Sequence, residues 1–112
     1  MAYGNALLAL ADPTRRQVFE QLRAGPRAVG QLAEAMPVSR PAVSQHLKVL
    51  KDAGLVREQR DGARRIYEID PQGLGALRRW IDSFWEESLA AFSAEAERTT
   101  DPIDTTTKET PQ

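Results

Sequence analysis

The sequence contains no cysteine, only one histidine, and few aromatic residues (two Trp, two Tyr and three Phe). The lack of cysteine excludes disulfide bonds and any metal site built on thiolates. No run of about 18 apolar residues is present, which excludes a membrane-spanning helix. The N-terminus lacks the basic segment of a signal peptide, and Asp12 and Pro13 interrupt its short apolar stretch. These features predict a cytoplasmic protein that does not contact a membrane.

Charge is distributed unevenly along the chain, although the formal net charge is only −1. Residues 40–65 hold seven basic and three acidic side chains, a balance of +4, whereas residues 66–112 hold four basic and ten acidic ones, a balance of −6. DNA binding depends on the local field and not on the charge of the whole chain. The basic segment is therefore compatible with a nucleic-acid partner. Taken alone, it is equally compatible with a solvated charged face.

The spacing of apolar residues predicts a mainly helical chain with one β-hairpin. Asp12 and Ser39 are placed to cap helices, and Gly25-Pro26 and Gly54 are placed to end them. The expected helices span residues 6–11, 13–24, 29–35, 40–53 and 71–96. The expected strands span 55–60 and 64–69, joined by a turn at Asp61-Gly62. Residues 1–97 then form one domain, and the polar residues 98–112 form a disordered tail.

This order of elements predicts a winged helix-turn-helix fold, mainly α with a small β-hairpin wing. Such a unit places its second helix in the DNA major groove. On a helix that starts after Ser39, Val43, Leu47 and Leu50 face inward, so the polar residues between them face outward. Arg40 then matches guanine and Gln45 matches adenine. Ser44 can serve either base.

The remaining candidate contacts have other roles. Pro41 offers an apolar surface to a thymine methyl group, and Lys48 and Lys51 are placed to contact phosphates. His46 is expected at the helix edge or on a phosphate, because no other strong ligand or nucleophile accompanies it. The predicted DNA-binding residues are Ser39, Arg40, Pro41, Ser44, Gln45, His46, Lys48, Lys51, Gly62, Arg64 and Arg65.

The wing carries two adjacent arginines, Arg64 and Arg65, whose side chains point to opposite faces of a strand. One of them is expected to reach the DNA backbone or minor groove. The other is expected to pair with an acidic neighbour such as Glu58.

The last helix carries a wide apolar and aromatic stripe, which favours packing against the same helix of a second subunit. The short N-terminal helix is expected to pack alongside. The predicted dimer interface comprises Leu7, Leu8, Leu10, Leu77, Trp80, Ile81, Phe84, Trp85, Leu89 and Phe92. A two-fold dimer presents two reading helices about one DNA turn apart, which predicts an inverted-repeat operator.

The segments ALADPTRRQVFEQL and VGQLAEAMPVSRPAVSQHLKVLKDAGLVREQRDGARRIYEID resemble the ArsR/SmtB family of bacterial transcriptional regulators over about residues 5–95. The resemblance implies a homodimeric winged-helix repressor. Arg40, Pro41, Ser44 and Gln45 match the family's DNA-contacting positions, and the wing matches at residues 62–65.

One departure from the family pattern concerns metals. Metal-sensing members carry a cysteine pair in the first helix of the motif, or histidine and carboxylate ligands on the final helix. Residues 31–33 contain no cysteine, and the final helix offers Asp82, Glu86 and Glu87 but no histidine. Carboxylates alone make a poor zinc or nickel site. The sequence therefore predicts a repressor without a metal or other cofactor.

Several alternatives remain open. Release from DNA is assigned equally to an organic ligand between the aromatic dimer helices, to a protein partner, or to autoregulated concentration. A winged-helix module that binds a protein partner through its aromatic face is a second class of function. A winged-helix activator, or an antibiotic-responsive repressor of a neighbouring family, would share the DNA chemistry of the first class. An enzyme is not predicted, because no nucleophile and base can be assembled from this composition.

Overall fold

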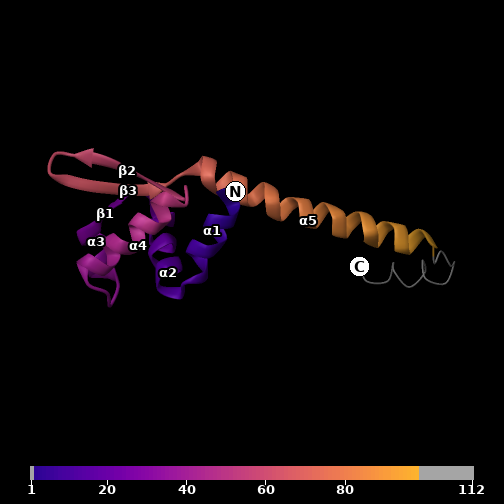
Figure 1. Ribbon diagram of the computed structural model, residues 1–112, viewed down its shortest axis with the longest axis horizontal. Helices are drawn as coiled ribbons and strands as arrows, with labels where there is room; N and C mark the ends of the chain where they lie inside the picture. The colour runs from indigo at the N-terminus through magenta and orange to yellow at the C-terminus, as the bar shows by residue number, and fades with distance from the viewer. Residues whose placement is uncertain (1, 99–112) are drawn as a thin grey trace. The chain divides into compact units, whose positions relative to one another are not determined.

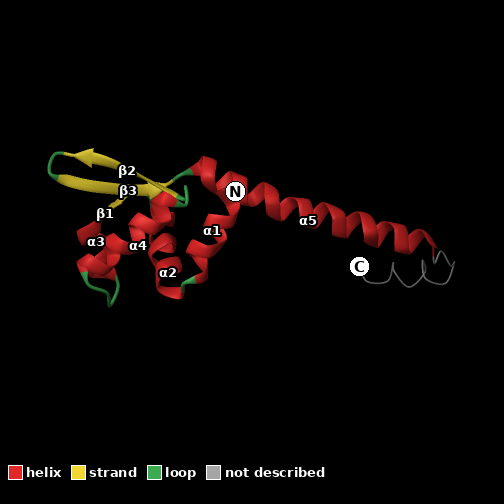
Figure 2. Ribbon diagram, in the orientation of Figure 1, coloured by secondary structure: helices red, strands yellow, loops and turns green. Residues whose placement is uncertain are grey.

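The computed structural model describes residues 2–98, which form six helical segments and three strands (Figures 1 and 2). In chain order these are α1 (Ala2–Ala11), α2 (Pro13–Gln21), the 3-10 turn η1 (Leu22–Ala24), β1 (Arg27–Ala28), α3 (Val29–Ala35), α4 (Arg40–Asp52), β2 (Val56–Asp61), β3 (Arg64–Ile69) and α5 (Pro71–Arg98). The predicted tail lies outside these residues, apart from Arg98, which ends α5. Within the described part of the chain, no helix is both long and apolar enough to cross a membrane.

The predicted helix caps are present. The Asp12 carboxylate accepts a hydrogen bond from the Arg15 backbone N–H at 3.0 Å, and Pro13 occupies the first helical position of α2. The Ser39 hydroxyl accepts from the Ala42 backbone N–H at 3.3 Å and begins α4. Because these side chains satisfy N–H groups that the helix leaves unbonded, local sequence fixes where both helices start.

The helices pack through one hydrophobic core. Val43, Leu47 and Leu50 are fully buried along one side of α4, as their spacing predicts. They pack in one cluster with buried residues that include Val18 of α2 and Leu32 of α3. Truncating a side chain buried to this degree costs about 2–5 kcal/mol. The core therefore fixes which side of α4 remains exposed.

Three antiparallel strands follow the order β1-β3-β2. The two-residue strand β1 was not predicted, and it pairs with β3 at Arg27↔Tyr67 and Ala28↔Ile66. The turn of the hairpin also differs from the prediction. Asp61 pairs with Arg64, so the two-residue loop is Gly62-Ala63, with Gly62 at a φ of +66°. Glycine adopts this left-handed conformation without a steric penalty.

The helix α5 contributes to two compact units of the chain. Its residues up to Trp80 belong to the first unit, with the elements that precede it, and its residues from Ile81 onward belong to the second. In the first unit, Gly73 of α5 lies so close to the Gly54 carbonyl that an added Cβ would overlap it. The first turn of α5 therefore packs directly against Gly54, the residue that follows the C-cap Ala53 of α4.

Candidate nucleic-acid interface

The exposed side of α4 carries the predicted base-reading residues. Arg40 and Pro41 form its first turn, and Ser44 and Gln45 follow one turn later; all four are exposed. Lys48 and Lys51 continue the exposed side, whereas His46 is half-buried. This arrangement follows from the core, because Val43, Leu47 and Leu50 occupy the opposite side. The structure thus gathers the predicted polar side chains on one accessible surface.

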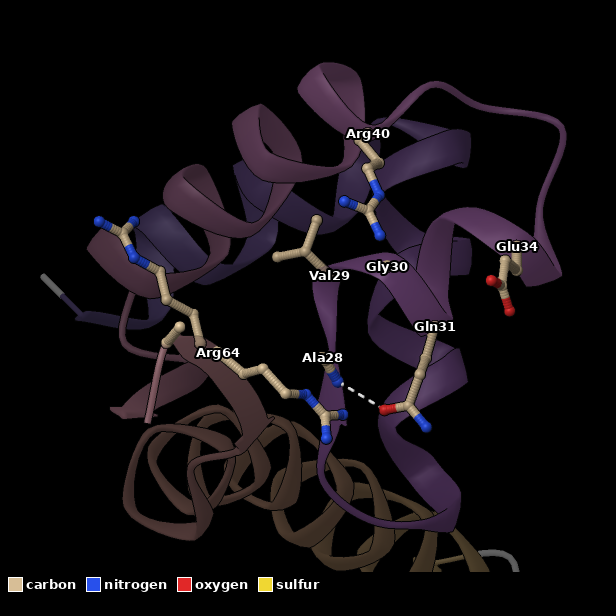
Figure 3. Close-up of a pocket in the computed structure, with 9 residues that line it drawn as sticks. Ala28, Val29, Gly30, Gln31, Glu34, Arg40 and Arg64 are labelled. Atoms are coloured by element: carbon tan, nitrogen blue, oxygen red, sulfur yellow. Dashed lines mark hydrogen bonds between the residues drawn. The ribbon is translucent and has the colours of Figure 1, made fainter. Parts of the chain in front are cut away.

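A cleft of about 450 Å³ joins the start of α4 to the wing, the hairpin formed by β2 and β3. Figure 3 shows the Arg40 side chain extending toward Gly30 of α3, with Arg64 of β3 also at the cleft. A Cβ at position 30 would clash with the Arg40 guanidinium. Arg65 also lines the cleft, so the lining contains three arginines and a single acidic residue, Glu34. The two wing arginines of this cleft, Arg64 and Arg65, suit a phosphate group.

Sequence reasoning missed the contribution of α3 to this cleft. The Gln31 side chain accepts a hydrogen bond from the Ala28 backbone N–H at 2.8 Å, which fixes the junction of β1 and α3 (Figure 3). Glutamine three residues after the cap residue is a known capping signal, and from the sequence it could have predicted the start of α3. The approach of Gly30 to Arg40 spans ten residues and has no local signature.

A second groove, of about 330 Å³, lies between α4 and the wing. Ser44, Gln45 and Lys48 line it from α4, and Glu58 and Arg65 line it from the wing. The groove therefore places two predicted base-reading side chains beside charged groups of the wing. Its basic residues are suited to phosphate, and its serine and glutamine to base edges.

The basic side chains of this groove are held by carboxylates. Glu58 Oε1 lies 2.9 Å from Lys51 Nζ, and Glu58 Oε2 lies 3.3 Å from Arg65 Nε. Lys48 pairs with Asp52 one turn along α4, at 3.1 Å. The predicted pairing of one wing arginine with Glu58 is confirmed, and that arginine is Arg65. The contact of Glu58 with Lys51 was not predicted, because it joins a helix to a strand.

The shared carboxylate has a perturbed pKa. The hydrogen bond from Lys51 and the positive charges of Lys51 and Arg65 lower the pKa of Glu58 below its ordinary value of 4.5, although desolvation opposes them. The same hydrogen bond raises the pKa of Lys51 above 10.5. At neutral pH both groups are charged, so the ion pair is intact.

This pKa shift predicts a pH-dependent stability difference between the wild type and Glu58→Gln. A carboxylate with a lowered folded pKa stabilises the fold above its unfolded pKa, and this contribution is lost as pH falls through the folded value. The wild type is expected to have the higher melting temperature above about pH 5, and the difference should vanish well below pH 4.5. Thermal denaturation followed by circular dichroism from pH 7 to 2.5 measures it. A difference that widens on acidification would contradict the assignment.

The predicted dimer residues separate into two groups. Leu77 is buried in the core of its own protomer, at 7% exposure, and Leu10 and Trp80 are half-buried against that core. The prediction that Leu77 faces a partner is therefore corrected: the apolar stripe is wide enough for one edge to pack internally. The exposed group comprises Leu7, Leu8, Ile81, Phe84, Trp85, Leu89 and Phe92.

Side chains that could bind a metal ion are few in the described part of the chain. Among residues 2–98, no group of three histidine, aspartate or glutamate side chains is arranged to hold a metal ion. The whole sequence offers no cysteine and a single histidine, His46, which lies on α4. The donor set present does not fit the thiolate or histidine-rich sites that sense transition metals.

A capped, exposed helix beside a basic antiparallel hairpin defines a winged helix-turn-helix DNA-binding protein. Residues 10–59 match the family model described as a helix-turn-helix domain. Over 85 residues the chain is 58% identical to the HTH-type transcriptional regulator Rv2034 of Mycobacterium tuberculosis, covering 76% of this chain and 79% of that protein. The chain belongs to the ArsR/SmtB family of transcriptional regulators.

Two further similarities support this placement. The transcriptional repressor SdpR of Bacillus subtilis is 32% identical over 71% of this chain and 89% of its own length. The homodimeric winged helix-turn-helix DNA-binding domain of Mb0332 from Mycobacterium bovis, a possible ArsR-family regulator, is 30% identical. It superposes with a TM-score of 0.63, covering 77% of this chain and 80% of that one. The fold and family are those of DNA-binding transcription regulators and not of enzymes.

Proposed function

We propose that this protein is a homodimeric repressor that occupies an inverted-repeat operator without a metal switch. The observation that carries the proposal is the exposed face of α4, where Arg40 lines one cleft shared with the wing, and Ser44 and Gln45 line the other. Base-reading groups flanked by phosphate-binding groups give sequence preference together with electrostatic affinity. Repression follows when the bound dimer covers a promoter. The similarity to SdpR, a transcriptional repressor, supports this role.

Selection from random-sequence DNA tests this proposal. The full-length protein is expected to enrich duplexes with two inverted half-sites whose centres lie about 10–10.5 base pairs apart. The selected duplex should bind two protomers, and binding should be unchanged by added zinc or a chelator. Enrichment of direct repeats or single half-sites would contradict the two-fold arrangement, and enrichment of no sequence would contradict specific binding.

The dimer is proposed to form through the exposed apolar residues of the second unit. Trp85, Leu89 and Phe92 are 66%, 55% and 74% exposed in the single chain. A row of large apolar side chains at helical spacing is a common surface for helix association. The homodimeric state of the Mb0332 domain supports the formation of a dimer.

Charge substitution on this row predicts loss of the dimer. Trp85→Glu/Leu89→Glu is expected to raise the dimer dissociation constant by about 100-fold or more, because two buried apolar groups are replaced by charges. Sedimentation velocity measures the change. Ala90→Glu/Ala94→Glu adds the same charge to the side of the same helix that faces away from this row, and it is the matched control. A double variant that remains as dimeric as this control would place the interface elsewhere.

Release by an organic ligand is the proposed regulatory step, at a hollow between α1 and α4 and not between the aromatic dimer helices as the sequence suggested. This hollow of about 240 Å³ is lined by Leu8, Ala9 and Val49, together with the polar residues Asn5, Arg15 and Asp52. A small apolar molecule with one polar group fits this lining, and it would touch α4 directly. A panel of small aromatic acids and amines added to the protein–DNA complex tests the step. Release by none of them would contradict it.

A further inference from the structure

One carboxylate on the proposed DNA-binding face is not explained by DNA binding alone. Glu58 of β2 lines the groove between α4 and the wing, together with Ser44 and Gln45. A negative charge at this place repels phosphate and lowers the attraction of the face for any DNA. Its presence among base-reading side chains indicates a role other than affinity.

The contacts of Glu58 connect the two elements that flank the DNA. One carboxylate oxygen accepts from Lys51 of α4, and the other faces Arg65 of β3. The Glu58 side chain is only 17% exposed, whereas Lys51 and Arg65 are about half exposed. A single acidic group therefore holds one cation from the recognition helix and one from the wing.

The other ion pairs of this region differ from this arrangement. Lys48 and Asp52 lie within one helix and are each about two-thirds exposed, so their pairing restrains little. Arg57 and Glu68 pair at 2.8 Å between neighbouring strands. Residues 57 and 68 lie directly opposite each other and one position from the Glu58↔Tyr67 pair, so they point to the other face of the ribbon. Among the described ion pairs, Glu58 alone joins α4 to the wing.

We propose that Glu58 is a specificity-determining residue, which holds Lys51 and Arg65 in the positions from which they meet phosphates beside a correctly seated recognition helix. This inference rests on the proposed function. Long basic side chains lose rotamer freedom when they bind at fixed positions, and prior ordering by Glu58 reduces that loss. Non-specific binding needs no fixed positions, and there the carboxylate only subtracts attraction. Glu58 therefore favours the operator over other DNA.

Glu58→Gln separates these two effects. Binding of the full-length protein is measured by fluorescence anisotropy from 0.05 to 0.4 M salt, on the duplex selected by the wild type and on a scrambled duplex of equal composition. Affinity for the scrambled duplex should rise about tenfold at 0.1 M salt, with a slope of log K against log salt steeper by about 0.9. Affinity for the selected duplex should rise by less than about threefold, because side-chain ordering offsets the electrostatic gain. The ratio of the two affinities should therefore fall.

Two further variants control for charge and folding. Glu58→Asp keeps the charge but is too short to hold both cations. It should leave scrambled-duplex binding within about twofold and weaken selected-duplex binding by about threefold or more. Glu68→Gln removes an ion pair from the opposite face of the ribbon and should leave the ratio of affinities unchanged. Thermal denaturation establishes that each variant is folded.

The possible outcomes distinguish this inference from the proposed function. If Glu58→Gln changes both affinities by the same factor, or Glu58→Asp binds the selected duplex as tightly as the wild type, Glu58 does not set specificity. The repressor proposal then stands. If the wild type enriches no sequence and binds both duplexes equally, the proposed function fails, and this inference fails with it.

Discussion

Replacing both Arg40 and Gln45 with alanine is expected to weaken binding to the selected duplex by about 30-fold to about 25,000-fold. Each bidentate contact with a base edge contributes about 1–3 kcal/mol of discrimination, and the two residues lie more than one helical turn apart on α4. Binding to a scrambled duplex should weaken much less, since only one positive charge is lost. Anisotropy titrations with both duplexes measure the two effects.

A matched control keeps the composition of this double variant but moves it away from the interface. Gln72 and Arg79 are exposed residues of α5 within the first unit, so Gln72→Ala/Arg79→Ala removes the same two side-chain types and the same charge. This control should bind the selected duplex within about threefold of the wild type. Equal losses in the two double variants would show that α4 does not read the bases.

Gly73→Ala is expected to destabilise the fold by about 2 kcal/mol or more. The helix propensity of alanine is more favourable than that of glycine by about 1 kcal/mol, and this effect alone would stabilise α5. The added Cβ, however, would overlap the Gly54 carbonyl, and a backbone group cannot move away by changing rotamer. Overpacking of this kind costs about 1–3 kcal/mol, and the cost rises when backbone must shift. Steric overlap therefore outweighs helix propensity.

Urea denaturation of Gly73→Ala and Gly75→Ala measures this difference. At position 75 the nearest atom to an added Cβ is the end of the Arg79 side chain, at 3.5 Å, which is ordinary contact. Gly75→Ala should therefore leave stability unchanged or raise it by up to about 1 kcal/mol. A Gly73→Ala variant as stable as Gly75→Ala would mean that the junction of α4 and α5 adjusts without cost.

Local signals in the sequence predicted much of this fold. Asp12 and Ser39 cap helices where expected, and the spacing of Val43, Leu47 and Leu50 gave the buried side of α4. These features depend on residues within one or two turns of each other. The hairpin was also expected, but its loop lies one residue later, because Asp61 retains its pairing with Arg64.

Features that depend on distant residues were not predicted. The strand β1 has two residues and no periodicity of its own, so only its pairing with β3 defines it. The approach of Gly30 to Arg40 joins separate elements, as does the contact of Glu58 with Lys51. The pattern of an apolar stripe likewise does not indicate which of its edges packs inside the protomer. For that reason Leu77 was assigned to the dimer interface.

The central claim is that α4 and the wing bind DNA with sequence preference and without a metal. It is tested most directly by anisotropy titration of the full-length protein with the selected and scrambled duplexes, at two salt concentrations, with zinc or with a chelator. We expect tighter binding to the selected duplex, a steep loss of affinity with salt, and no response to zinc or chelator. Equal binding to both duplexes, or release of the selected duplex by zinc, would contradict it.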